Sequence, residues 1–304
     1  MSLGGGRHRG ERSADGVAGR PNSTTVVSRA TAVVAGLPGR SGHWALAWLR
    51  QALPWLVRLT SIGALLAAWE VYGRLQETRL FFAPLSEVVM ALWDLAQTRE
   101  FWSAYQDTLT PFLYGWALAM VLGIPLGLLI GRFAAIARIS NPYLAFLNAL
   151  PISTLVPVVF IGWSQIGSGL GIEARTTVVF LFAVVEIILN TAAGVRYVSR
   201  ELMEMGRSFG ASQWQLFRRI ILPGSLPGIM VGARIGTGRA VVGMVVVEVL
   251  LVAVGVGRLI DRYRSRFLAP ELFAVVLSLA IFGIVLLEIV RRVERRVLRW
   301  RPEA

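Results

Sequence analysis

The chain contains no cysteine and no lysine, and its only histidines are His8 and His43. Without cysteine it has no disulfide, no zinc finger and no thiol nucleophile. Without lysine it lacks the ATP-binding Walker A loop, in which a lysine contacts the phosphates. Both histidines precede the first long apolar run, so we expect no catalytic triad and no metal site. These absences predict a protein that is not an enzyme, binds no cofactor and cannot hydrolyse ATP itself.

Charged residues are also scarce, at 16% of the 304 residues, whereas 55% of the residues are hydrophobic. A soluble domain carries about 25% charged residues, so the composition predicts a polytopic membrane protein. The formal net charge of +13 comes from arginines that cluster beside apolar runs. That placement favours membrane orientation and contact with anionic lipid, and we expect no nucleic-acid partner.

Six apolar runs reach the roughly 20 residues that a helix needs to cross a bilayer. The predicted spans are residues 54–73, 109–131, 143–163, 176–195, 229–254 and 272–290. With both chain ends inside the cell, 21 arginines lie on inner segments and 8 on outer loops, in agreement with the positive-inside rule. The sequence therefore predicts an all-α, multi-pass protein of the cell inner (plasma) membrane with six transmembrane helices.

The spans suggest a simple division of the chain. Residues 1–43 are rich in Gly, Arg, Ser and Thr and are predicted to form a disordered basic tail. Residues 44–104 hold the first span and an outer interfacial helix, for which Ser86 is the expected N-cap. Residues 105–290 are expected to form the membrane core, and residues 291–304 a basic cytoplasmic tail.

The last outer loop, residues 258–266, carries four arginines and so departs from the positive-inside rule. Two interpretations stay open for it. It forms either a short amphipathic segment on the lipid headgroups, or a basic collar that attracts an anionic substrate or an acidic docking protein.

Residues 123–131 and residues 228–236 each carry a glycine at every fourth position. Small residues at this spacing lie on one face of a helix and let a neighbouring helix approach closely. Both ladders are therefore predicted to be packing surfaces.

A polar, arginine-bearing segment, residues 201–223, lies between two of the apolar runs. Its first part has apolar residues at helical spacing up to Phe209. Gly210 is expected to end that helix, because glycine tolerates the left-handed turn found past helix ends. Ser212 is expected to cap a second short helix that Pro223 ends. Two amphipathic helices that meet at a glycine suit docking into a groove on a soluble partner.

The spacing of this segment is Glu204-Met-Gly-(three residues)-Gly210-(nine residues)-Ile220-x-Leu222-Pro223. It resembles the EAA loop of ABC-importer permeases of the binding-protein-dependent type, with Met205 and Gly206 in place of two alanines. The longer stretch from Ser208 to Pro227 resembles the branch of this family that serves nitrate, sulfonates and taurine. The resemblance implies a homodimer of this chain, a separate ATP-hydrolysing subunit that binds the ATP, and an extracytoplasmic solute-binding protein.

The resemblance also implies roles for the residues of the loop. Glu204 and Gly210 would fix its shape, aromatic residues would fill a groove on the ATPase, and arginines would pair with acidic groups on the rim of that groove. The expected coupling residues are Glu204, Arg207, Phe209, Gly210, Ala211, Trp214, Phe217, Arg218, Ile220, Leu222 and Pro223.

Polar and charged residues within the apolar runs are candidates for the solute pathway, because such groups are costly at bilayer depth unless paired or hydrated. The stretch from Asn148 to Pro157 is interrupted by prolines, which is typical of a segment that lines a cavity. The expected pathway residues are Asn148, Ser153, Thr154, Glu186, Asn190, Arg239 and Glu248. Glu186 and Arg239 either pair as a buried structural bridge or both face the pathway.

Two other functional classes stay open at this stage. An ion-coupled secondary transporter would use Glu186 and Glu248 as proton relays, although it has no need of a long, ordered cytoplasmic loop. A membrane enzyme is disfavoured by the missing Cys, Lys and well-placed His. Arginines in the outer loop and pathway favour a small anion such as a sulfonate, nitrate or taurine as the solute, whereas the two glutamates favour a cation.

Overall fold

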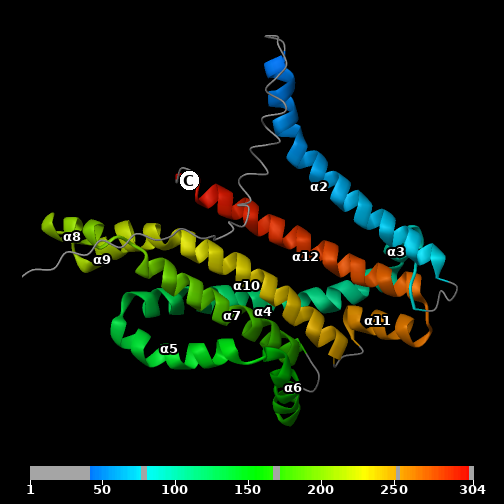
Figure 1. The fold of residues 1–304 in the computed structure, drawn as a ribbon. Coiled ribbons are helices and arrows are strands. Elements are labelled where there is room, and N and C mark those ends of the chain that lie inside the picture. The colour runs from blue at the N-terminus through cyan, green and yellow to red at the C-terminus, as the bar shows by residue number, and fades with distance from the viewer. Residues whose placement is uncertain (1–41, 77–80, 167–171, 251–253, 301–304) are drawn as a thin grey trace, which may run out of the picture. The chain divides into compact units, whose positions relative to one another are not determined.

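The computed structural model describes residues 42–76, 81–166, 172–250 and 254–300, and every regular element in these ranges is helical (Figure 1). The all-α expectation is therefore confirmed for these ranges. The chain divides into two units, residues Met1–Leu65 and Leu66–Ala304. Helix α2 (Gly42–Leu75) begins in the first unit and ends in the second. Apart from Gly42 and His43, which begin α2, the predicted basic tail lies outside the described residues.

The second unit continues with short and long helices in turn. They are α3 (Leu85–Ala96), α4 (Arg99–Arg132), α5 (Ala134–Ala149), the 3-10 helix η1 (Ile152–Leu155), α6 (Val156–Gln165), α7 (Ile172–Arg196), α8 (Arg200–Ser208), α9 (Gln213–Leu216), the π-helix η2 (Phe217–Ile221), α10 (Leu222–Leu250), α11 (Gly255–Ser265) and α12 (Ala269–Val297).

Within the described ranges, four helices are long and apolar enough to cross a membrane, or five spans if one bent pair is counted. The four are Arg99–Arg132, Ile172–Arg196, Gln213–Leu250 and Ala269–Val297. They overlap the predicted spans 109–131, 176–195, 229–254 and 272–290. The predicted span 54–73 is helical within α2, but α2 is not among the helices that meet this test.

The predicted span 143–163 is not one straight helix. It divides into α5 and the pair η1–α6, which are bent by 88° relative to each other. Pro151 causes the break, because it lacks an N–H donor and holds Leu150 in an extended conformation, with φ −69° and ψ 133°. The N–H and the hydroxyl of Thr154 both donate to the carbonyl of Pro151, each at 2.8 Å, and begin the new direction.

Helix α7 is the centre of the core, packed between α4 and α10 (Figure 1). The glycine ladder of α4 faces it: a Cβ atom added to Gly127 would lie 2.6 Å from Cβ of Thr191. The ladder of α10 faces it as well, because a Cβ atom on Gly236 would lie 2.5 Å from Cγ1 of Ile187. The prediction that both ladders are packing surfaces is confirmed.

The interfacial helix expected after the first span is present as α3, but Ser86 is not its N-cap. Pro84 occupies that position. The N–H and hydroxyl of Ser86 instead donate to the two carboxylate oxygens of Glu70 in α2, at 2.9 and 2.8 Å. A carboxylate at a helix N-terminus is favourable because of the helix dipole, so Glu70 takes over the capping role from a distance in sequence.

The arginine-rich loop, residues 258–266, lies mostly in helix α11 and is amphipathic, which does not decide between the two interpretations. Its apolar face is buried, with Val256 and Leu259 0% and 1% exposed. On its polar face, Arg262 pairs with Glu100 of α4 at 2.6 Å, and Arg264 pairs with Asp261 at 2.7 Å.

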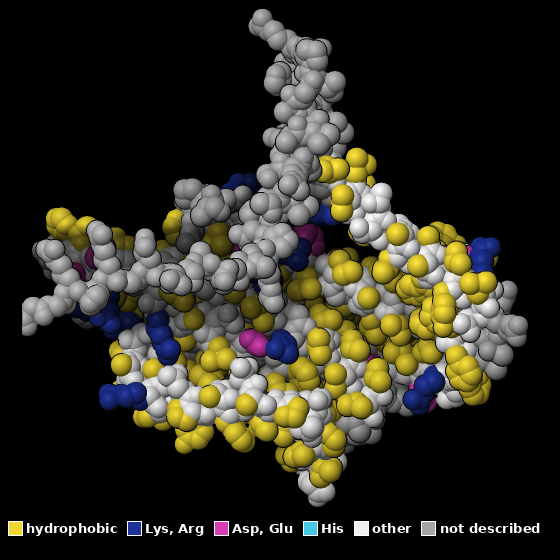
Figure 2. Space-filling view, in the orientation of Figure 1, with side chains coloured by type: hydrophobic (Ala, Val, Ile, Leu, Met, Phe, Trp, Pro, Cys, Tyr) yellow, Lys and Arg dark blue, Asp and Glu magenta, His cyan; other side chains and the backbone are white. Residues whose placement is uncertain are grey.

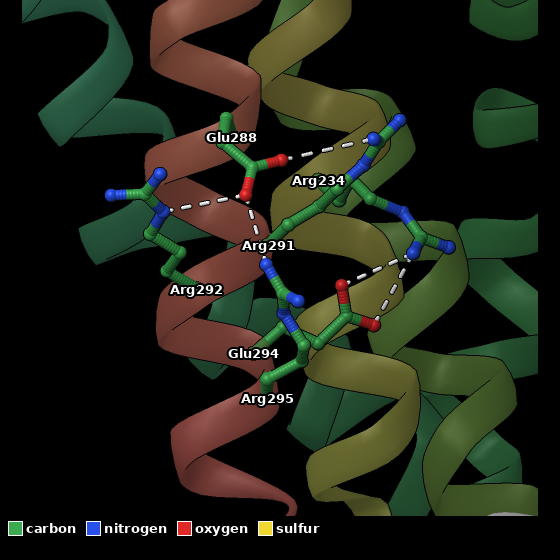
Figure 3. Close-up of polar contacts among 6 residues, drawn as sticks. All are labelled: Arg234, Glu288, Arg291, Arg292, Glu294 and Arg295. Atoms are coloured by element: carbon green, nitrogen blue, oxygen red, sulfur yellow. Dashed lines mark hydrogen bonds and ion pairs between the residues drawn. The ribbon is translucent and has the colours of Figure 1, made fainter. Parts of the chain in front are cut away.

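Residues 291–297 are not a tail, because α12 continues to Val297. Glu288 lies within ion-pair distance of three arginines of its own helix: Arg291 at 3.9 Å, Arg292 at 3.3 Å and Arg295 at 2.9 Å (Figure 3). The pairs with Arg291 and Arg292, three and four residues from Glu288, support a helix beyond its apolar part. Glu294 pairs with Arg234 of α10 at 3.1 Å and ties the end of α12 to the core.

Candidate functional site

Helices α8 and α9, with the π-helical turn η2 and the start of α10, form a bent segment that we call the helical elbow, residues 200–223. Gly210 has φ +75°, the left-handed conformation that glycine adopts without strain. Its N–H donates to the carbonyl of Arg207 at 2.9 Å, and the N–H of Ala211 donates to the carbonyl of Gly206 at 3.0 Å. The prediction that Gly210 ends the first helix is confirmed.

The second helix of the elbow begins with a capping box, in which Ser212 and Gln215 bond reciprocally. The Ser212 hydroxyl accepts from the Gln215 N–H at 3.3 Å, and the Ser212 N–H donates to Oε1 of Gln215 at 2.8 Å. Two donors at the start of the helix are satisfied in this way. The prediction of Ser212 as the N-cap is confirmed.

Pro223 does not end the second helix, contrary to the sequence-based prediction. The helical chain is continuous from Gln213 to Leu250. A π-helical turn at residues 217–221 precedes the proline, and the N–H of Leu222 donates to the carbonyl of Phe217. Wider π-helical spacing displaces the carbonyl that a proline ring would otherwise meet. The second helix of the elbow is therefore continuous with α10.

Gly206 sets how closely the two helices of the elbow pack. A Cβ atom on Gly206 would lie 2.7 Å from Cδ2 of Leu216 and 2.9 Å from Cδ1 of Ile220. Leu216 is the buried residue at this contact, only 2% exposed. Sequence reasoning assigned the shape to Glu204 and Gly210. The side chain of Glu204 makes no hydrogen bond or ion pair with the part of the chain that is described. The Met205-Gly206 pair, which stands in place of two alanines, was the feature of the sequence that could have pointed to Gly206.

The outer surface of the elbow combines exposed aromatic and basic side chains. Phe209 is 83% exposed and Trp214 is 66% exposed. The rings of Trp214 and Phe217 are stacked, with centroids 5.7 Å apart. Around them the expected arginines are exposed: Arg207, Arg218 and Arg219. Figure 2 shows yellow and dark blue side chains together at the end of the molecule that carries α8 and α9. The elbow thus presents an apolar and cationic surface to a partner.

A second feature is a small charged cavity of about 210 Å³ between the bend at Pro151 and helices α7 and α10. Nη2 of Arg239 lies 3.2 Å from Oε1 of Glu186, so the two residues pair and also line the cavity. The cavity brings together four of the seven expected pathway residues: Asn148, Ser153, Glu186 and Arg239. Its lining carries one positive charge, one negative charge and two neutral hydrogen-bonding groups.

Two other expected pathway residues lie beside this cavity. The Thr154 hydroxyl is bonded to the carbonyl of Pro151, as described above. The amide of Asn190 donates to the carbonyl of Glu186 at 2.8 Å. Asn190 also lines a larger cavity of about 530 Å³ nearer the elbow, together with Tyr197, Trp300 and several small residues of α7 and α10. Asn190 therefore lines the larger cavity and is bonded to the backbone of Glu186, which lines the charged one.

The remaining candidate, Glu248, is not among the residues that line either cavity. It is 4% exposed. Its Oε1 accepts from the Thr108 hydroxyl at 2.8 Å, and its Oε2 accepts from the Gly257 N–H at 2.6 Å. The same Thr108 hydroxyl accepts from the N–H of Val256 at 2.9 Å. Glu248 thus joins α4, α10 and α11, and sequence reasoning did not foresee the part of Thr108.

No group of three or more His, Asp or Glu side chains among the described residues could hold a metal ion.

Comparison with known proteins agrees with this geometry. Residues 123–299 match the family described as "Binding-protein-dependent transport system inner membrane component". The formylaminopyrimidine transport permease protein ThiX of Halalkalibacterium halodurans is 30% identical over 239 residues, 79% of this chain and 93% of the relative. The putative aliphatic sulfonates transport permease protein SsuC of Escherichia coli is 31% identical over 257 residues, 84% of this chain and 94% of the relative.

A further relative is the taurine transport system permease protein TauC of Escherichia coli, 27% identical over 252 residues, 80% of this chain and 89% of the relative. Among solved structures, the MetNI methionine ABC transporter in an inward-facing conformation has a similar fold. Its TM-score is 0.53 at 20% identity, over 66% of this chain and 94% of that chain. This chain therefore belongs to the binding-protein-dependent family of ABC-transporter permeases, multi-pass inner-membrane subunits that are not themselves catalytic and whose ATP is bound by a partner subunit.

Proposed function

We propose that the chain is the membrane subunit of an importer, in which the helical elbow receives the motion of an ATP-hydrolysing subunit. In this proposal an extracytoplasmic binding protein delivers a small solute to the charged cavity. The observation that carries the proposal is the shape of the elbow: two helices bent at Gly210, with an exposed apolar and cationic surface, continuous with a membrane-crossing helix.

The continuity of α9, η2 and α10 supports a mechanical role. Arg239 lies 26 residues beyond Gln213 in one helical rod, which corresponds to about 40 Å along the axis. A displacement of the elbow is therefore carried along α10 to the charged cavity without an intervening hinge loop. Rigid helices with two alternative arrangements are a physical means of coupling distant sites.

The full assembly that we propose contains two copies of this chain, with the pathway at their interface and two ATPase subunits below. Each copy would cross the membrane six times, with residues 54–73 of α2 as the first span and the bent α5–α6 pair as the third. The excess of arginine on the inner segments supports this topology.

The charged cavity supports a small solute with an anionic group, such as a sulfonate, nitrate or taurine. The side chain of Arg239 is 57% exposed although it pairs with Glu186, so its guanidinium retains donors for a ligand. The cavity of about 210 Å³ is smaller than the 300–1,000 Å³ of sites that bury drug-sized ligands. Relatives named for sulfonates and taurine support the same class of solute.

The test of the proposal is Gly210→Val, in proteoliposomes that contain the chain, its ATPase and its binding protein. A β-branched residue is strongly disfavoured at φ +75°, so the elbow should change shape. We expect normal insertion into the membrane and loss of ATP-driven uptake. Gly162→Val is the matched control, because a Cβ atom on Gly162 meets nothing within 4 Å.

Two results would overturn the proposal. One is wild-type uptake by the Gly210→Val variant. The other is uphill uptake by the chain alone, driven by an ion gradient and insensitive to ATP, which would identify a secondary transporter that uses Glu186 and Glu248.

A further inference from the structure

An apolar groove of about 670 Å³ lies beside the elbow, between the last two turns of α4 and the start of the second elbow helix. Its walls are apolar, with Pro125, Leu128 and Leu129 on one side and the stacked rings of Trp214 and Phe217 on the other. Its polar rim consists of Arg132 and Gln213. The family assignment explains the elbow itself, but it does not explain an apolar groove with one charged end.

The depth of the groove indicates what occupies it. Residues 109–131 form the apolar run of α4, and Arg132 is its first charged residue on the cytoplasmic side. Leu129 and Pro125 lie about 5 and 10 Å from Arg132 along the helix axis, on the side of the hydrocarbon. A soluble subunit does not reach that depth, whereas a lipid acyl chain does. Trp214 lies at the headgroup end, the level where tryptophan is enriched in membrane proteins.

The charge at the rim indicates which class of lipid binds in the groove. Nη2 of Arg132 donates to Oε1 of Gln213 at 2.7 Å, and its guanidinium carbon lies 5.5 Å from the ring centroid of Phe133. Within the described ranges Arg132 has no carboxylate partner, unlike Arg234, Arg239 and Arg262. A guanidinium held in place with unused donors suits a phosphate oxygen, and an anionic headgroup at the cytoplasmic surface supplies one.

We propose that this groove binds one anionic phospholipid, with an acyl chain along Pro125, Leu128 and Leu129 and the headgroup phosphate on Arg132. Because the groove joins α4 to the elbow, the lipid would hold the elbow against the membrane core. The inference uses the membrane topology of the chain but not the coupling role of the elbow. It therefore stands or falls separately from the proposed function.

The absence of cysteine makes a direct test simple, because one introduced cysteine is the only thiol. In Leu129→Cys, a bimane fluorophore reports on the groove of the full chain in nanodiscs. The nanodiscs contain either phosphatidylglycerol or phosphatidylcholine with brominated acyl chains, which quench the fluorophore on contact. We expect phosphatidylglycerol to be preferred about fivefold at this site, the effect of one arginine at the membrane surface. Val121→Cys, exposed on α4 but outside the groove, should show no preference.

The headgroup contact is tested in the same labelled protein. Arg132→Gln should remove the preference for phosphatidylglycerol, and Arg132→Lys should keep most of it. Arg138→Gln, which removes an exposed arginine six residues further along that does not line the groove, should leave the preference unchanged. Equal quenching by both lipids in the wild-type background, or a preference that survives Arg132→Gln, would overturn the proposal. So would protection of Leu129→Cys from both lipids, which would show that a second protein chain covers the groove.

Discussion

Gly194 of α7 and Gly228 of α10 lie backbone against backbone: a Cβ atom added to Gly194 would lie 2.8 Å from the Cα atom of Gly228. Both glycines also line the cavity of about 530 Å³. Close approach of this kind replaces the hydrophobic effect as the main attraction between helices in a bilayer.

Gly194→Ala should therefore force α7 and α10 apart and lower the free energy of unfolding by about 1–3 kcal/mol. Gly238→Ala, in α10, is the control, because the nearest neighbour of the added Cβ atom would be Cδ2 of Leu287 at 3.9 Å. Thermal unfolding in detergent should show a lower midpoint for the first variant and an equal or higher one for the second. Equal midpoints would contradict the assigned contact.

Arg239→Gln should reduce uptake of an anionic solute, because it removes the only positive charge that lines the small cavity. Hydrogen bonds to charged groups are worth about 1.5–3 kcal/mol, so the initial rate at low solute concentration should fall by roughly 10-fold to 100-fold. Arg234→Gln is the matched control, since Arg234 pairs with Glu294 of α12 and does not line the cavity. Equal losses in both variants would indicate that Arg239 serves the fold alone.

Glu248→Ala should cost stability and leave the solute preference unchanged. It removes the acceptor for the Thr108 hydroxyl and the Gly257 N–H, both of which are buried, and a buried donor left unpaired costs about 1–3 kcal/mol. Thr108→Val should have a similar effect, and the double variant should lose less than the sum, because the two residues share one interaction. Thermal unfolding and competition between solutes measure the two properties. A changed solute preference would indicate that Glu248 takes part in the solute pathway.

Phe209→Ala should weaken binding of the ATPase subunit, since Phe209 is 83% exposed on the elbow and does not line the apolar groove. An exposed aromatic side chain at the centre of an interface contributes about 2 kcal/mol or more, which corresponds to a roughly 30-fold higher Kd. Trp93→Ala provides the comparison, since Trp93 is 71% exposed on α3, outside the elbow. Both Kd values are measurable with the chain in nanodiscs and the ATPase in solution. An unchanged Kd for the first variant would indicate that the ATPase contacts other residues of the elbow.

Several features of the elbow and core were predictable because they depend on neighbours in sequence. The helix end at Gly210 follows from the conformational freedom of that residue, and the cap at Ser212 involves a partner three residues away. The glycine ladders of α4 and α10 follow from the helical repeat, which places every fourth residue on one face. Apolar run length likewise indicated the four helices that are long and apolar enough to cross a membrane.

Other features needed the tertiary structure. Proline usually ends or kinks a helix, so the sequence predicted a helix end at Pro223. The π-helical turn before Pro223 explains why the helix continues. The capping of α3 by Glu70 depends on how α2 and α3 meet, a relationship that no local pattern contains.

The sequence by itself determined that this chain is a helical membrane protein without its own ATP-hydrolysing loop, and that residues 201–223 form two short helices bent at Gly210. Composition and local spacing suffice for those conclusions, because they express chain-level chemistry and backbone preference. The tertiary structure alone decided that Glu186 pairs with Arg239 at a cavity, whereas Glu248 is held by Thr108, 140 residues away. The fate of a buried charge depends on which helix packs against it, and packing is a property of the folded chain.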